Sequence, residues 1–218
     1  MPGSDTSLDQ LRDQYLHTQL AGDRRAALQF IDGALRAGHS VSAVRSGVVQ
    51  AAQREIGRLW QEDRISIAQE HLATAISHLA LAHLFQQAEF RARVGRKIIV
   101  ACVPGELHDL PARLLADALD VDGYDVRFLG ADVPLPDLLD AVGIEQPDLL
   151  ALSVTMIFNL PSMRETLRRV RGAHPQLPIA VGGHAAVNAS AQEIDPRIFY
   201  ATTEELLGQV ERWLEKPS

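Results

Sequence analysis

A continuous apolar run at residues 97–103, Lys-Ile-Ile-Val-Ala-Cys-Val, constrains the fold more than any other stretch of this chain. A strand buried on both faces has this composition, whereas a half-exposed strand alternates apolar and polar residues. A Pro-Gly turn and a segment with helical spacing, residues 112–119, follow directly. Strand, turn and helix form the first half of a βαβ unit, so we expect a parallel sheet covered by helices on both faces.

The rest of the C-terminal half repeats this alternation of strands and helices. Further strands are predicted at residues 124–129, 148–153, 178–181 and 197–200, and further helices at 134–142, 160–170 and 203–214. Five parallel strands in the order 2-1-3-4-5 are a common arrangement, with its topological switch between the first and third strands. We therefore expect residues 96–218 to form a Rossmann-like (flavodoxin-like) five-stranded parallel sheet domain.

The N-terminal half reads as four successive helical segments. Asp23 and Ser40 are suited to cap the second and third helices, each shortly after a glycine that ends the preceding one. The fourth helix is predicted from about Ser66 to about Arg91. Because short connections favour antiparallel neighbours, we expect residues 1–93 to form a four-helix bundle.

Composition excludes several classes of protein. Cys102 is the only cysteine, which rules out disulfides and a cysteine-based zinc site and fits a reducing compartment. The formal net charge of −7 disfavours direct nucleic-acid binding, which depends on clustered Lys and Arg. No stretch approaches the ~18 uninterrupted apolar residues of a membrane helix, and no secretory signal is visible. We therefore expect a cytoplasmic protein without a membrane segment.

Distinctive polar and small residues follow three of the predicted strands at their carboxyl ends. They are Glu106 and His108, Ser153 and Thr155, and Gly182 and Gly183. In the expected strand order these ends are adjacent and frame one crevice at the switch point. The first turn lacks the G-x-G-x-x-G of dinucleotide sites and the lysine of a P-loop. A loop imidazole beside such a crevice suits a metal held inside a large cofactor.

These residues resemble the signature of the cobalamin-binding domain family, which is D-x-H-x-x-G, then S-x-L or S-x-T, then G-G. The resemblance implies that His108 is the lower axial ligand of cobalt and replaces the cofactor's own dimethylbenzimidazole. It also implies that the displaced nucleotide tail enters the crevice, where Ser153 and Thr155 contact it. Gly182 and Gly183 would then leave room for the tail.

The N-terminal half is similar to the cap over the upper corrin face in methionine synthase-like proteins. Trp60, nine residues and then Glu70-His71 match the W-x9-E-H pattern of CarH-like and LitR-like B12-dependent photoreceptors. In that group E-x-H on the binding loop is also typical, although Glu106 and Pro111 depart from the wider family's Asp and Gly. The resemblance places Trp60 and His71 beside the adenosyl group, with Glu70 as a hydrogen-bond partner. From residue types alone, Trp60 as core and Glu70 as a helix cap is the alternative.

The resemblance implies a cobalamin-binding light sensor, with adenosylcobalamin as its cofactor, that repacks its cap when the upper cobalt ligand is lost. We expect no enzyme activity, because no nucleophile–base pair has support in the sequence. We expect signalling through a homo-oligomer or a partner regulator protein, because the bundle begins within the first ten residues and leaves no helix-turn-helix. The alternative is a corrinoid carrier protein of a methyltransferase system. A third reading is an interaction module that binds no cofactor.

Three further residues bear on the subtype. Some CarH-like regulators have a histidine directly after the tryptophan that ligates cobalt after photolysis, whereas this chain has Gln61. An amide is a weak cobalt ligand, so we doubt a bis-histidine light state at this position. Stand-alone relatives, the photocobilins, also bind a bilin such as biliverdin. His78 and His83 could line the space for it, with core or surface placement as the alternative.

Overall fold

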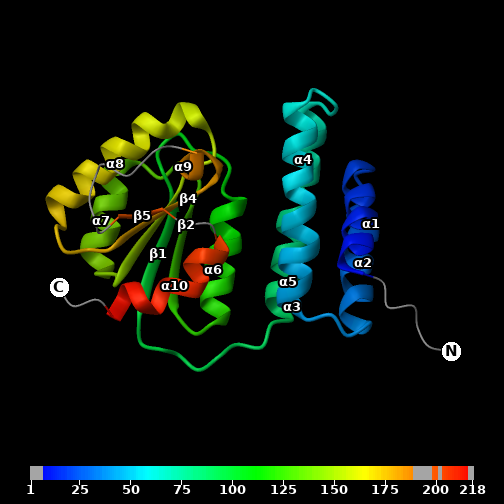
Figure 1. Ribbon diagram of the computed structural model, residues 1–218, viewed down its shortest axis with the longest axis horizontal. Helices are drawn as coiled ribbons and strands as arrows, with labels where there is room; N and C mark the ends of the chain where they lie inside the picture. Colours follow the sequence, from blue (N-terminus) through cyan, green and yellow to red (C-terminus); the bar gives the residue numbers. More distant parts are fainter. Residues whose placement is uncertain (1–6, 189–197, 201–202, 216–218) are drawn as a thin grey trace. The chain divides into compact units, whose positions relative to one another are not determined.

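A computed structural model describes residues 7–188, 198–200 and 203–215 of the 218-residue chain. The chain forms two compact units, Met1–Glu89, which is helical, and Phe90–Ser218, which contains the sheet (Figure 1). Among the described helices, none is both long and apolar enough to cross a lipid bilayer.

The helical unit follows the four predicted segments. Its elements are α1 (Leu8–Leu20), α2 (Arg24–Arg36), α3 (Val41–Val44), the π-helical η1 (Arg45–Gln50), α4 (Ala51–Gln61) and α5 (Ile67–Gln86). The third predicted helix corresponds to α3, η1 and α4, which continue one another with helical backbone angles. The predicted caps are present, because Asp23 Oδ1 accepts from the Ala26 amide at 2.9 Å and Ser40 Oγ from the Ala43 amide at 3.1 Å.

The fourth helix ends at Gln86, earlier than the predicted Arg91. Gln87 and Ala88 still donate to Leu84 and Phe85, whereas from Arg91 onward the backbone forms hydrogen bonds within the sheet unit. The Arg91 amide donates to the Val121 carbonyl at 2.9 Å, and the Val94 amide donates to the Gly123 carbonyl at 3.0 Å. These partners lie far along the chain, so the local apolar spacing could not reveal that they replace the helical hydrogen bonds.

The sheet has the predicted order, β2-β1-β3-β4-β5, and all its paired strands are parallel. The strands are β1 (Lys97–Cys102), β2 (Asp125–Gly130), β3 (Leu149–Ser153), β4 (Ile179–Gly182) and β5 (Ile198–Tyr200). The helices of this unit are α6 (Leu110–Val121), α7 (Leu135–Glu145), the 3₁₀ turn η2 (Ile157–Asn159), α8 (Leu160–Ala173), the unforeseen short α9 (His184–Asn188) and α10 (Thr203–Glu215).

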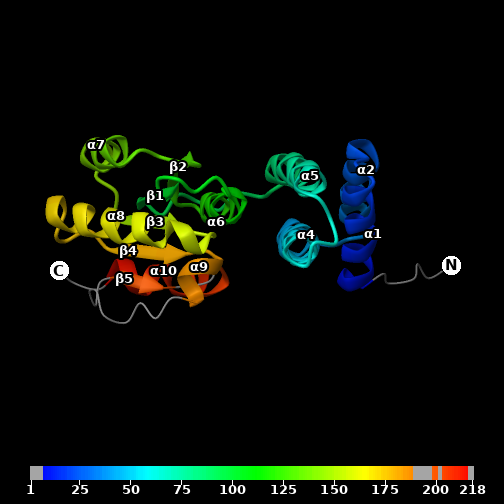
Figure 2. The same ribbon diagram turned by 90° about the horizontal axis from the view of Figure 1, so that it is seen from above.

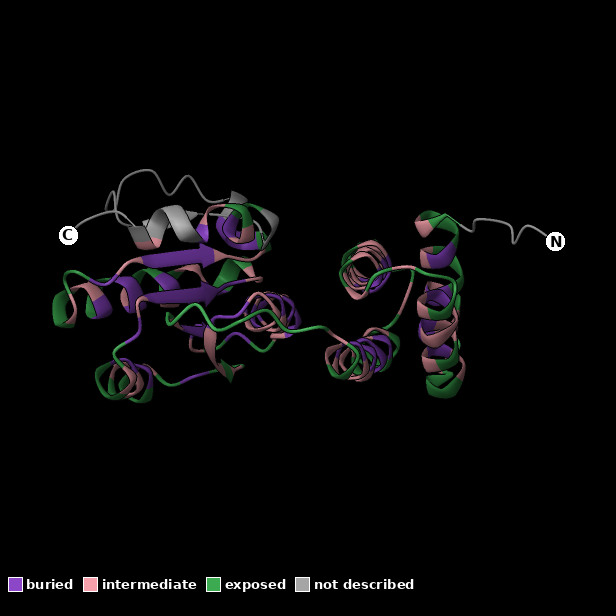
Figure 3. Cartoon of the chain, turned by 90° about the horizontal axis from the view of Figure 1, so that it is seen from below, coloured by how far each residue is buried: buried purple, intermediate pink, exposed green. Residues whose placement is uncertain are grey.

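Helices lie on both faces of the sheet (Figure 2). Alternate residues of the central strands belong to two different cores, one on each face. Ile99 and Leu150 join a core with α7 and α8, whereas Ile98 and Leu149 join a second core with α6 and α10. The central strands are therefore buried on both sides (Figure 3), as the unbroken apolar runs predicted. Each fully buried Ile or Leu stabilises the fold by about 1.5–3 kcal/mol, which fixes the strand ends that carry the polar residues.

Candidate functional site

Glu106 and His108 interact within the loop that follows β1. The Glu106 side chain is fully buried, whereas 40% of the His108 side chain is exposed. Glu106 Oε1 lies 2.6 Å from His108 Nδ1 and also accepts the His108 backbone amide at 3.0 Å. A carboxylate accepts only, so Nδ1 carries the proton and the lone pair of a neutral ring lies on Nε2. Such a fixed tautomer is typical of an imidazole that ligates a metal.

The other carboxylate oxygen of Glu106 connects this loop to the turn after β3. Glu106 Oε2 accepts from the amides of Thr155 at 2.8 Å and Met156 at 2.9 Å, and from Asn159 Nδ2 at 3.0 Å. Burial alone would raise the pKa of Glu106, but the hydrogen bonds from His108, Met156 and Asn159 outweigh it and lower the pKa to about 2. The carboxylate is therefore ionised at neutral pH.

Three further residues, which the sequence analysis missed, hold the loop in place. Asn159 Nδ2 also donates to the Gly105 carbonyl at 3.2 Å, and Ser162 Oγ donates to the Pro104 carbonyl at 2.7 Å. Asp132 Oδ1 accepts the Gly105 amide at 2.7 Å, and the Asp132 amide donates to the Glu106 carbonyl at 2.9 Å. An Asn before a helix normally suggests an N-cap, so its sequence position gave no sign of this contact.

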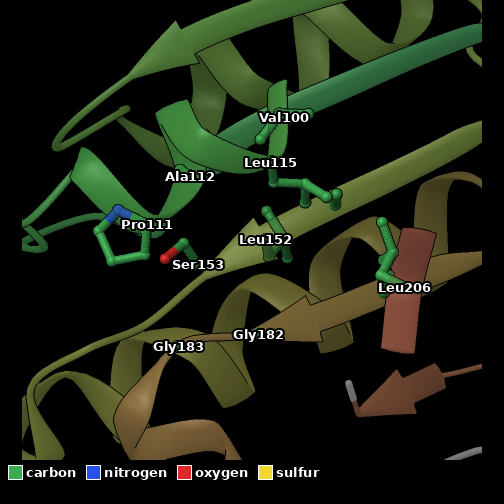
Figure 4. Close-up of a pocket in the computed structure, with 11 residues that line it drawn as sticks. Val100, Pro111, Ala112, Leu115, Leu152, Ser153, Gly182, Gly183 and Leu206 are labelled. Atoms are coloured by element: carbon green, nitrogen blue, oxygen red, sulfur yellow. The ribbon is translucent and has the colours of Figure 1, made fainter. Parts of the chain in front are cut away.

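A narrow apolar cleft lies beside the loop, on the sheet face that α6 and α10 cover. Its volume is about 30 Å³, and Ser153 lies in it between Pro111 and the Gly182-Gly183 corner (Figure 4). Leu115 and Leu206 line its apolar part, together with Val100, Ala112, Ala151, Leu152 and Ala180. The cleft thus joins the ends of β3 and β4, where the sequence analysis expected a crevice.

Two hydroxyl groups at this edge are buried without a hydrogen-bond partner in the part of the chain that the structure describes. They are Ser153 Oγ and Thr155 Oγ1. A buried polar group that is left unpaired costs about 1–3 kcal/mol, so such groups usually indicate a ligand or water partner. Ser153, which lines the cleft, is suited to contact a polar ligand that enters it.

Gly183 is required for close packing of two backbones. Its φ is +98°, a left-handed conformation, and a Cβ atom there would lie 2.3 Å from the Val154 carbonyl oxygen. The adjacent Gly182 carbonyl accepts the Val154 amide at 2.9 Å. The two glycines therefore keep the ends of β3 and β4 in contact and also line the cleft.

Large apolar side chains are exposed around the imidazole loop. Leu107 is 70% exposed between Glu106 and His108, and Ile157 and Phe158 are 70% and 71% exposed in η2. The hydrogen bonds from Met156 and Asn159 to Glu106 fix η2 against this loop. Since the loop carries a lone imidazole and an apolar surround, it is suited to a metal that arrives in a large, flat, apolar cofactor.

The remaining predicted residues belong to the helical unit and lie at one end of it. Trp60 is in the last turn of α4, and Glu70 and His71 are near the start of α5. Asp63, with φ of +54°, ends α4 through hydrogen bonds from its amide to Trp60 and from the Arg64 amide to Leu59. His71 is 74% exposed, and its Nε2 lies 3.6 Å from Glu70 Oε2.

Of the two histidines considered for a bilin, His83 has a partner within the helical unit. His83 Nε2 lies 2.6 Å from Asp32 Oδ1, which joins α5 to α2. This contact favours the structural alternative for His83. His78 is partly buried on the same helix.

Comparisons with known proteins relate both units to corrinoid proteins. Residues 96–209 match a family model described as B12 binding domain, and residues 11–85 match a second model with that description. The HTH-type transcriptional repressor CarH of Myxococcus xanthus is 35% identical over 134 residues, which are 61% of this chain and 44% of the repressor. The chain therefore aligns with less than half of that relative's length.

Two methanogen proteins are similar over more of their length. Dimethylamine corrinoid protein 1 of Methanosarcina acetivorans is 22% identical over 171 residues, which are 75% of this chain and 79% of that protein. The structure of the Methanosarcina barkeri monomethylamine corrinoid protein matches with a TM-score of 0.77 at 15% identity, and covers 94% of this chain and 99% of that one. This likeness shows that the two chains share a fold of helical unit and Rossmann-like sheet.

Proposed function

Because this chain belongs to the B12 binding domain family, we propose that it binds cobalamin with His108 as the lower cobalt ligand and acts as a light sensor. The observation that carries the cofactor site is the 2.6 Å contact between the buried Glu106 carboxylate and His108 Nδ1. Because Nδ1 carries the proton, the lone pair of Nε2 is available to a metal. The loop that carries it is held at the ends of β1, β2 and β3. Bound adenosylcobalamin would supply a cobalt–carbon bond that light cleaves.

The residues around His108 fit such a cofactor. The exposed Leu107, Ile157 and Phe158 offer apolar area to the underside of a corrin ring. Ser153 and Thr155 offer unpaired hydroxyls to the nucleotide tail, and the apolar cleft offers a place for its aromatic base. At about 30 Å³ the cleft holds little more than a water molecule, so binding requires Leu115 and Leu206 to move apart.

The light-sensing part of the proposal depends on Trp60, Glu70 and His71. The W-x9-E-H spacing and the 35% identity to the CarH repressor support it. We propose that Trp60 and His71 contact the upper ligand and that Glu70 holds His71 in place. Loss of that ligand would remove its contacts with Trp60 and His71. Such a local change can shift the helices from one packing arrangement to another. The signal would pass through self-association or a partner regulator protein.

A corrinoid carrier of a methyltransferase system is the second candidate. It is favoured by the match to the dimethylamine corrinoid protein, which extends over 79% of that protein's length. A carrier needs the same His108 site but an upper face that opens to a partner enzyme. It has no requirement for Trp60, Glu70 and His71 together, which separates it from the sensor.

The two candidates are separated by illumination of the protein loaded with adenosylcobalamin. For a sensor we expect green light to change both the absorption spectrum and the elution volume in size-exclusion chromatography. Trp60→Ala should speed loss of the adenosyl group, and Trp60→Phe should largely restore its retention. An unchanged spectrum and elution volume, with methyl transfer that survives Trp60→Ala, would establish the carrier instead.

A bilin as second chromophore is a separate part of the proposal. It is tested by adding biliverdin to the loaded protein, because a bound bilin adds absorption bands at longer wavelength than those of cobalamin. Bands that His78→Ala removes would support a bilin site beside α5. A spectrum equal to the sum of the free components would exclude it.

A further inference from the structure

A chain of hydrogen bonds crosses the interior of the helical unit from α1 to Glu70. Gln19 Nε2 donates to Ser77 Oγ at 2.8 Å, and Ser77 Oγ donates to Gln53 Oε1 at 2.8 Å. Gln53 Nε2 in turn donates to Thr74 Oγ1 at 2.6 Å, and Thr74 Oγ1 donates to Glu70 Oε1 at 2.7 Å. This series of hydrogen bonds connects side chains of α1, α4 and α5, and we call it the polar chain.

Every donor in the polar chain points in the same direction. Each of the two hydroxyl groups accepts one hydrogen bond and donates the next, and the Gln53 amide accepts from Ser77 and donates to Thr74. The final acceptor, the Glu70 carboxylate, cannot donate when it is ionised, so it sets the direction for all the others. Hydrogen bonds arranged in series polarise one another, which provides a physical route between Glu70 and Gln19.

The end of the polar chain at α1 is deeply buried and has unused hydrogen-bonding capacity. Gln19 and Ser77 are fully buried, and Gln19 Nε2 also donates to the Ala73 carbonyl at 3.0 Å. Gln19 Oε1 has no hydrogen-bond partner among the described residues. Gln19 is therefore fixed to α5 through Nε2 alone, and only this amide group connects α1 to the polar chain.

The other end of the polar chain lies at the W-x9-E-H motif. Glu70 uses Oε1 for Thr74, while its Oε2 lies 3.6 Å from the exposed His71 imidazole. The Glu70 side chain is only 14% exposed, so its rotamer is set by these neighbours and not by solvent. Thr74 and Gln53 are the groups that hold it from the interior.

We propose that Gln53 and Thr74 are positioning residues for Glu70, and that the polar chain couples the W-x9-E-H end of α5 to α1. The coupling itself needs no cofactor. Its use as a signal rests on the proposed function, in which Glu70 and His71 face the upper cobalt ligand. In that case a change at the cofactor alters the order of α1 through Thr74, Gln53 and Ser77.

The coupling is tested first in the full chain without cofactor. The quantity measured is the hydrogen-exchange rate of the Gln19 side-chain amide by NMR. We expect Glu70→Ala and Thr74→Val each to speed this exchange about two- to tenfold, the range that corresponds to one hydrogen bond. Thr74→Ser keeps the hydroxyl and should leave the rate within about twofold. The double variant should be no faster than the faster single variant, because both changes break the same chain.

Ile56→Val is the matched control, because it removes one methylene from the same core without altering a polar group. The effect of Ile56→Val on the Gln19 exchange rate measures the general loss of stability. The effects of the other variants are corrected for it. If Thr74→Val does not fold, Gln53→Leu takes the place of that variant, because it removes both the hydrogen bond to Thr74 and the one from Ser77. The coupling would be overturned if Glu70→Ala left the Gln19 exchange rate unchanged. It would also be overturned if the effects of the two single substitutions on that rate were additive in the double variant.

A second experiment asks whether the coupling carries the light signal. In the protein loaded with adenosylcobalamin, illumination should change Gln19 exchange about two- to tenfold, and Thr74→Val should reduce that change to less than about twofold. A light response of Gln19 that persists unchanged in Thr74→Val would overturn the signalling role. Absence of any spectral light response in the unaltered chain would refute the sensor but leave the result without cofactor standing.

Discussion

Glu106 Oε1 lies 2.6 Å from His108 Nδ1, while Glu106 Oε2 binds three donors from the turn after β3. One buried carboxylate therefore joins the imidazole loop of β1 to the end of the neighbouring strand. The orientation of His108 and the closure of this edge of the sheet depend on the same side chain. Variants of Glu106 should consequently affect both stability and the proposed metal site.

Glu106→Ala should lower the free energy of unfolding of the cofactor-free protein by about 2–4 kcal/mol, because it leaves the buried donors of Thr155, Met156 and Asn159 without an acceptor. The measurement is urea denaturation followed by circular dichroism. Glu165→Ala on α8 removes an exposed ion pair with Arg168 and should change stability by less than about 0.5 kcal/mol. Equal effects of the two variants would contradict the role of Glu106.

The stability of the sheet unit should fall in acid through Glu106. Its pKa is about 2 in the folded chain against an ordinary value of 4.5, so the folded state holds the proton less tightly. The contribution is therefore complete above about pH 4.5, and it is lost as the pH falls toward 2. Urea midpoints between pH 6 and 2.5 measure it. The Glu106→Gln side chain cannot ionise, so the urea midpoint of this variant should fall less between pH 6 and 2.5. An identical dependence on pH would show that Glu106 does not cause the loss of stability in acid.

Gly183→Ala should destabilise the protein by about 2–4 kcal/mol, through left-handed backbone strain and the clash with the Val154 carbonyl. Gly143→Ala is the control, because this helical glycine of α7 has open space around it and alanine favours helix. We expect this control to stabilise the chain by about 0.5–1 kcal/mol. Thermal or urea unfolding compares the two, and a neutral Gly183→Ala would show that the strand ends can separate.

Cys102 should resist alkylation until the sheet unit unfolds. Burial raises the pKa of its thiol to about 12, and the thiol faces the His108 carbonyl at 3.9 Å. Only the thiolate reacts quickly, so iodoacetamide at pH 8 should modify the protein in urea but not in buffer, as mass spectrometry would report. Rapid modification of the native protein would show that β1 opens locally.

His108→Ala should change the cobalt absorption bands of the loaded protein, because the lower ligand would no longer be an imidazole of the chain. Loss of an outer-shell partner alone costs about 10- to 100-fold in metal affinity, so we expect loss of the ligand to lower cobalamin affinity by at least about 10-fold in a spectroscopic titration. His17→Ala, an exposed histidine of α1, serves as the control and should leave the bands unaltered. Bands of His108→Ala identical to those of the unaltered chain would mean that another base ligates the metal.

Much of the sheet unit follows from local pattern. The apolar runs at 97–103 and 148–153 favour strands covered on both faces, and parallel connections then restrict the order of the strands. Once that order is given, His108, Ser153 and Gly182 must lie at one edge. The helices of the first unit follow in the same way from their spacing and their caps.

The interactions of the site depended on tertiary structure. The contact of Asn159 with Glu106 and that of Gln53 with Thr74 join residues far apart in the chain, and no local pattern encodes them. The course of the chain from Arg91 likewise depends on Val121 and Gly123, whose carbonyls accept the amides of Arg91 and Val94. By itself the sequence determined which residues meet at the edge of the sheet, because strand pattern and chain connectivity are local properties. Only the fold decided which atoms bind one another, because hydrogen bonds depend on positions within a few tenths of an ångström.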